Sequence, residues 1–260
     1  MSSERVWEID FLRALAILLM VTFHIVYDLD WLTNLNVSYE DPFWYWVGKS
    51  SALMFMFVSG ISSGFSKDTV RRGLKVFCYA LIVTVVTYFS LRAEYVRFGI
   101  LHFLAVSMLL FPVLKKLPVV YLLIISIISI VLGLYFHQSV TNTWLLIPFG
   151  LTYPEFSTID YYPLFPYLGV TTLGIIAYKV FYSKGKRIIK KTWPAPSLYD
   201  LGKGPSSTYA TSNFSFLNGI KKRQGSNTLT FVSKHSLPIY LLHQPIILAV
   251  LYLFKLSGLK

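Results

Sequence analysis

The sequence has little cysteine and little charge, and each shortage excludes a class of protein. Cys78 is the single cysteine in 260 residues, so the chain has no disulfide framework. Only 14% of the residues are charged, whereas 55% are hydrophobic, which excludes an ordinary soluble globule. No glycine-rich phosphate loop and no closely spaced pair of histidines occurs. We therefore expect neither a nucleotide-binding loop nor a metal site.

In place of charge, the chain has apolar segments long enough to cross a bilayer. Its mean hydropathy is +0.57, and a membrane-spanning helix needs about 20 mostly apolar residues. The segment 144–151 is apolar but too short to cross, so we expect it at the membrane interface. The sequence predicts an all-α integral membrane protein with about seven transmembrane helices, at 9–29, 43–64, 74–91, 98–114, 118–136, 163–182 and 232–254.

The basic residues predict how these helices are oriented. Most of the 24 lysines and arginines fall on one side of the membrane when the N-terminus is placed inside, which predicts an N-in, C-out topology. The net charge of +12 is then a signal of topology, and we expect no nucleic acid partner. The chain divides into six helices at 1–182, a basic and mobile cytosolic linker at 183–231, and a seventh helix with its tail at 232–260, all in one membrane domain.

The first predicted helix carries its ionisable residues on one face. Arg13 and His24 are separated by about 20° around the helix axis, and Asp10 and Asp28 both lie about 60° to one side. His24 is about 16 Å further along the helix than Arg13. Ionisable groups at membrane depth are costly and normally face a partner or a cavity. The stripe therefore indicates a polar interior suited to a long anionic molecule whose reactive end lies at His24.

His24 has a structural and a catalytic interpretation. It is either a core histidine bonded to a neighbouring carbonyl or a general base. Asp28 follows it by one helical turn. It either orients the imidazole and raises its basicity or is a carboxylate at the membrane interface.

Two further histidines lie inside predicted helices. His243 is near mid-membrane, on the face of Ser236 and Tyr240, and serves either chemistry or an interhelical hydrogen bond. His102 is about one turn deep and could approach His24 from the outer half of the membrane. Lys49 has a similar depth, but its long side chain can reach the surface, so we expect an interfacial role.

Arg71 and Arg72 form a short basic run near the predicted inner surface. Such a run usually marks only the cytosolic side. It would equally bind phosphates through charge-assisted hydrogen bonds.

Several of these motifs occur together in a known family. The first helix, Arg5-Val-Trp-Glu-Ile-Asp-Phe-Leu-Arg13 with Thr-Phe-His24, resembles that of the heparan-α-glucosaminide N-acetyltransferase catalytic-domain family in its short prokaryotic form. The blocks Phe55-Met-Phe-Val-Ser-Gly, Arg97-Phe-Gly-Ile-Leu-His, Tyr162-Pro-Leu-Phe-Pro-Tyr and His235-Ser-Leu-Pro-Ile-Tyr-Leu-Leu-His also resemble that family, in the same order. The first helix is similar, too, to that of membrane O-acyltransferases of the same transmembrane acyltransferase superfamily.

The resemblance implies a function. It implies transfer of an acyl group, usually acetyl, from cytosolic acyl-CoA to a sugar or similar hydroxyl or amine acceptor beyond the membrane of a prokaryotic cell. It also implies that Arg13 helps to hold the CoA end. From their positions near the inner surface, we expect Asp10, Arg71 and Arg72 to belong to the same donor site.

By the match to the O-acyltransferases, His24 would be the base, with Asp28 orienting it and His243 or His102 as a second polar group. Which histidine is catalytic stays open. The competing hypothesis is a small proton-coupled transporter whose buried His and Asp groups relay protons. The sequence leaves a homo-oligomer open.

Overall fold

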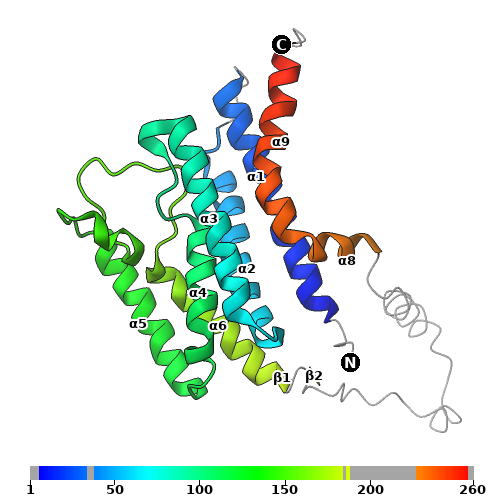
Figure 1. Ribbon diagram of the computed structural model, residues 1–260, viewed down its shortest axis with the longest axis vertical. Coiled ribbons are helices and arrows are strands. Elements are labelled where there is room, and N and C mark those ends of the chain that lie inside the picture. Colours follow the sequence, from blue (N-terminus) through cyan, green and yellow to red (C-terminus); the bar gives the residue numbers. More distant parts are fainter. Residues whose placement is uncertain (1–5, 34–37, 184–185, 188–226, 257–260) are drawn as a thin grey trace, which may run out of the picture.

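The computed structural model describes residues 6–33, 38–183, 186–187 and 227–256. Figure 1 shows a bundle in which successive long helices run in opposite directions, so the start of the first helix and the end of the last lie at opposite ends of the bundle. The described helices are α1 Trp7–Leu32, α2 Pro42–Phe65, α3 Thr69–Leu91, α4 Ile100–Leu114, α5 Val119–His137, α6 Leu164–Phe181, α8 Asn227–Lys234 and α9 Ser236–Leu256. Short 3-10 helices occur at η1 Arg92–Glu94 and η2 Trp144–Phe149, and two-residue strands at β1 Tyr182–Ser183 and β2 Lys186–Arg187.

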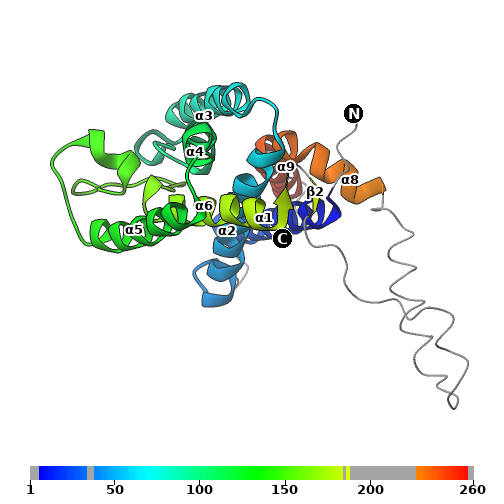
Figure 2. The ribbon, with the colours of Figure 1, turned by 90° about the horizontal axis from the view of Figure 1, so that it is seen from below.

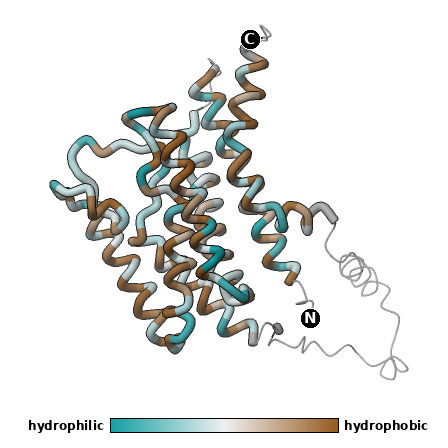
Figure 3. Tube along the Cα trace, in the orientation of Figure 1, coloured by the Kyte–Doolittle hydropathy of each residue, from teal (hydrophilic) through white to brown (hydrophobic). Residues whose placement is uncertain are grey.

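The prediction of an all-α membrane protein is confirmed. Five of the described helices are long and apolar enough to cross a bilayer, namely α1, α3 with η1, α5, α6 and α9. α4 is a shorter apolar helix, and α2 runs 24 residues antiparallel to α1. The helix middles are mostly hydrophobic and the connecting turns mostly polar (Figure 3). The short segment predicted at 144–151 forms η2 and does not cross.

Close helix contacts at glycine hold the centre of the bundle together. α2 and α6 lie between α5 on one side and α1, α8 and α9 on the other (Figure 2). A Cβ atom at Gly60 would lie 2.3 Å from the Thr171 carbonyl oxygen, and one at Gly174 would lie 2.2 Å from the Phe57 carbonyl oxygen. Only glycine permits this approach, which is the small-residue packing typical of membrane helices.

The prediction for the seventh helix was wrong about where that helix begins. The predicted span 232–254 is two helices, because α8 ends at Lys234 and α9 begins at Ser236. Pro238 explains the break, since its ring would clash with the carbonyl of residue 234 in a continuous helix. α8 runs across the bundle, whereas α9 runs along it beside α1 (Figure 1).

Two other boundaries differ from prediction. α3 begins at Thr69 rather than at 74, because the Asp68 carboxylate accepts a hydrogen bond from the Arg71 N–H at 2.9 Å and caps the helix. The predicted linker 183–231 lies mostly outside the described residues, and α8 occupies its last positions. Its predicted mobility therefore stays a prediction.

Candidate functional site

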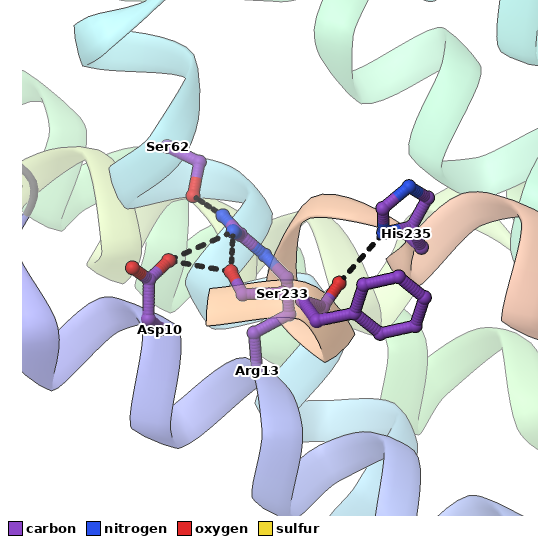
Figure 4. Close-up of polar contacts among 6 residues, drawn as sticks. Asp10, Arg13, Ser62, Ser233 and His235 are labelled. Carbon is purple, nitrogen blue, oxygen red and sulfur yellow. Dashed lines mark hydrogen bonds and ion pairs between the residues drawn. The ribbon is translucent and has the colours of Figure 1, made fainter. Parts of the chain in front are cut away.

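The N-terminal half of the α1 stripe forms a tight polar network with α2 and α8. The Arg13 guanidinium donates to Ser233 Oγ and Ser62 Oγ, each at 2.6 Å. Ser233 Oγ in turn donates to Asp10 Oδ1 at 2.5 Å, and Asp10 lies 3.5 Å from Arg13. Figure 4 shows the four side chains converging from three helices. We call this set the Arg13 network, and it fastens α8 to the rest of the bundle.

The C-terminal half of the stripe brings two histidines together. The rings of His24 on α1 and His243 on α9 lie edge to face, with centroids 4.6 Å apart. His24 Nδ1 lies 2.9 Å from the Met20 carbonyl oxygen, and His243 Nδ1 lies 2.6 Å from the Tyr240 carbonyl oxygen. A carbonyl only accepts, so each Nδ1 carries the proton and each Nε2 has a lone pair.

Within the described part of the chain, one of these lone pairs has no hydrogen-bond partner. His243 Nε2 is buried and has no hydrogen-bond partner among the residues that the structure describes. A buried unsatisfied nitrogen is costly, and such atoms in native structures call for an explanation. Nε2 is therefore the atom of this ring that is available as a hydrogen-bond acceptor.

Asp28 does not orient the His24 imidazole directly, contrary to one of the two sequence interpretations. Its carboxylate is 1% exposed and accepts from Gln244 Nε2 at 2.8 Å and 3.0 Å. The Met20 carbonyl orients His24 instead. Because Gln244 directly follows His243 in α9, Asp28 joins α1 to α9 beside the histidine pair.

His102 does not approach His24 as expected. Its Nε2 lies 3.2 Å from Thr84 Oγ1 on α3, and its Nδ1 accepts from the Gly99 N–H at 3.3 Å. Its ring contacts Phe77 and Phe98, at the interface of α3 and α4. Both ring nitrogens therefore belong to a separate cluster.

A line of polar side chains leads from the histidine pair toward α2 and α6. The ring centroids of Tyr240 and His243 lie 5.5 Å apart, and Asp160 and Tyr162 act on Tyr240 electrostatically. Tyr162 packs on Tyr167 of α6, with ring centroids 5.1 Å apart. Burial, reinforced by the Asp160 carboxyl, raises the pKa of Tyr162, which keeps its hydroxyl neutral.

Asp160 lies in the loop before α6 and caps α4. Its Oδ2 accepts from the Ile100 N–H at 3.0 Å. Burial raises the pKa of Asp160 to about 6, although this hydrogen bond opposes the shift. Sequence reasoning missed Asp160, because a capping residue 60 positions away leaves no local pattern.

Lys49 and Gln244 were also missed as site residues. Lys49 hydrogen-bonds the Tyr167 hydroxyl instead of extending to the surface. Gln244 was visible as a polar residue in an apolar span, but its partner Asp28 is 216 positions away.

The predicted donor-binding residues lie in two places. Arg71 and Arg72 are exposed near the start of α3, a helix that packs chiefly on α4. Arg13 and Asp10 lie on α1, which packs on α2, α8 and α9. Among the described residues, no group of three His, Cys, Asp or Glu side chains gathers as metal ligands.

Most of the chain, including the first helix and its polar stripe, matches a known family. Residues 5–205 match the family described as heparan-alpha-glucosaminide N-acetyltransferase, catalytic. The chain belongs to this family. Comparison with curated proteins and with solved structures found no match. The match confirms the family resemblance seen in the sequence and places the chain in a family of membrane acetyltransferases. The resembling block that begins at His235 lies beyond the matched residues, so its resemblance stays a prediction.

The family match ends before α8 and α9. These helices supply Ser233, His243 and Gln244, which contact the α1 stripe. In this chain the residues that contact the polar stripe of α1 therefore come partly from helices that lie outside the matched residues.

Proposed function

We propose that this chain transfers an acetyl group from cytosolic acetyl-CoA to a sugar or similar acceptor at or beyond the outer face of the membrane. Family membership supports the acetyl transfer. The observation that carries the proposal is the pair formed by His24 and His243, whose Nδ1 atoms are both held by helix carbonyls. This arrangement leaves the Nε2 atoms of two neighbouring imidazoles as hydrogen-bond acceptors inside the helix bundle.

His24 acts as the general base in this proposal. Its Nε2 takes the proton from the acceptor hydroxyl or amine as the acceptor's lone pair attacks the thioester carbonyl. The tetrahedral intermediate collapses, the carbon–sulfur bond breaks, and the thiolate of CoA leaves with the proton from the imidazolium. His243 is the second imidazole, which holds the acceptor or shares the proton.

The donor enters from the basic side in this proposal. Arg71 and Arg72 are exposed and free to meet phosphates at the start of α3. Arg13, paired with Asp10, lies between that side and the histidines and holds the inner part of CoA. Donor phosphates would then take over hydrogen bonds that Arg13 makes to Ser233 and Ser62.

Acetyl transfer by the purified protein tests the proposal. We expect His24→Ala to lower turnover of acetyl-CoA by about 10²–10⁴-fold, the usual contribution of a general base. His137→Ala is the matched control, because His137 is exposed at the end of α5. Equal turnover in both variants would remove His24 from the chemistry, and no acetyl-CoA turnover by the wild type would refute the proposed function.

A further inference from the structure

Lys49 is a cation in the α2 helix that has no anionic partner in the part of the chain that the structure describes. Its ammonium group hydrogen-bonds the Tyr167 hydroxyl and lies over two tyrosine rings, 4.7 Å from the centroid of Tyr167 and 5.5 Å from that of Tyr162. Among the residues that the structure describes, no carboxylate lies within ion-pair distance of it. An ammonium has three N–H donors, and Tyr167 takes one of them.

The depth of Lys49 in the helix bundle makes an ammonium group without a counter-charge unfavourable in free energy. Lys49 is half-buried and lies seven residues after Pro42, the first residue of α2, which corresponds to about 10 Å along the helix. Cations at such depth normally reach the surface or pair with an anion. Lys49 does neither, because the two tyrosines hold its side chain in the bundle.

Packing on one side and an electrostatic interaction on the other relate Lys49 to the histidine pair. A Cβ atom at the preceding residue, Gly48, would lie 2.8 Å from the ring of Phe23, and the Phe23 ring packs edge-on against His24. On the other side, Tyr162 under Lys49 is within electrostatic range of Tyr240, whose ring contacts His243.

We propose that Lys49, Tyr162 and Tyr167 form a subsite for an anionic group, a carboxylate, sulfate or phosphate, carried by the acceptor. The inference rests on the proposed function for the direction from which the acceptor arrives. The anion would take the free N–H donors of Lys49 and balance its charge, and the neutral Tyr162 hydroxyl could donate to it. The phosphates of CoA arrive from the opposite side and belong to the arginines.

The preference between two acceptors tests the subsite. Glucosamine 6-phosphate and glucosamine differ in the anion alone, so the ratio of their kcat/KM values reports its recognition. We expect Lys49→Met to lower this ratio by about tenfold or more, as for the loss of a charge-assisted hydrogen bond, and Lys49→Arg to keep it. Lys75→Met is the matched control, because Lys75 also lies over a tyrosine ring, 6.0 Å from Tyr79, but is exposed near the start of α3. An unchanged ratio in folded Lys49→Met would overturn the proposal.

A binding measurement separates this inference from the proposed function. We expect glucuronate, but not glucose, to raise the melting temperature of the purified protein in neutral detergent. The rise should be kept in Lys75→Met and lost in Lys49→Met and Lys49→Gln. This result would support the subsite even if no acetyl transfer were found.

The same assay distinguishes the two sources of an anion. If phosphatidylglycerol, and not glucuronate, stabilises the protein in a manner that depends on Lys49, the anion is a lipid headgroup and the acceptor assignment is overturned. Acetyl transfer with no effect of Lys49 in either assay would overturn the subsite and leave the proposed function standing.

Discussion

The two ends of α1 differ in whether the polar side chains around them are hydrogen-bonded to one another. Near its N-terminus, Arg13, Asp10, Ser62 and Ser233 satisfy one another across three helices. Near its C-terminus, His243 Nε2 is buried without a partner among the described residues, and Lys49 on the neighbouring α2 has no carboxylate there. Both ends face the same cost of polar groups at membrane depth. In the protein without its donor, the first end satisfies its polar groups with hydrogen bonds between helices, whereas the second leaves polar atoms available to a ligand.

The comparison predicts that the Arg13 network matters most for stability. Arg13→Ala removes two hydrogen bonds from a charged donor and leaves Asp10 without its cation, so we expect a loss of about 2–4 kcal/mol in the free energy of unfolding. Thermal unfolding in detergent measures it, with Arg71→Ala as the exposed control. Comparable melting temperatures for both variants would show that the network does not fasten α8.

The pairing of Asp28 and Gln244 gives a second, smaller effect. Gln244→Leu leaves a buried carboxylate without its donor, which should cost about 1–3 kcal/mol. The double variant Asp28→Leu with Gln244→Leu should be less destabilised than Gln244→Leu alone, because an apolar pair leaves no group unsatisfied. Additive losses in this double-mutant cycle would mean that the two side chains do not depend on each other.

Asp160 should make stability depend on pH. Burial raises its pKa from 3.8 to about 6, so the folded protein binds this proton more tightly than the unfolded chain. Its contribution to stability is therefore greatest below about pH 4, declines as the pH rises, and is lost above about pH 6. We expect Asp160→Asn, which keeps an acceptor for the Ile100 N–H, to remove about 1–2 kcal/mol of this decline. Unfolding at pH 4.5 and 7 measures it, and parallel pH profiles for variant and wild type would contradict it.

Local patterns predicted the helices and the polar face of α1 that other helices cover. Apolar runs located six of the spans to within a few residues, because membrane burial selects them by composition. The 3.6-residue repeat placed Asp10, Arg13, His24 and Asp28 on one face, and each of them contacts α8 or α9.

Partners distant in the sequence could not be predicted. The repeat fixes which face a residue occupies but not which helix covers that face. For this reason one of the two interpretations of Asp28 paired it with His24, its neighbour by four residues, whereas its partner is Gln244. Lys49 was treated as a residue that reaches the surface, since nothing local shows Tyr162 and Tyr167 around it. The break between α8 and α9 did have a local signal, Pro238, but an average of hydropathy over the whole span does not register a single proline.

The central claim is that His24 and His243 form one reactive unit. The most direct test measures kcat for acetyl transfer in His24→Ala, His243→Ala and the double variant, with folding checked by thermal unfolding. If the imidazoles act together, each single change lowers kcat by about 10²-fold or more and the double variant is little worse than the poorer single one. Full turnover in either single variant, or losses that multiply in the double variant, would contradict the account.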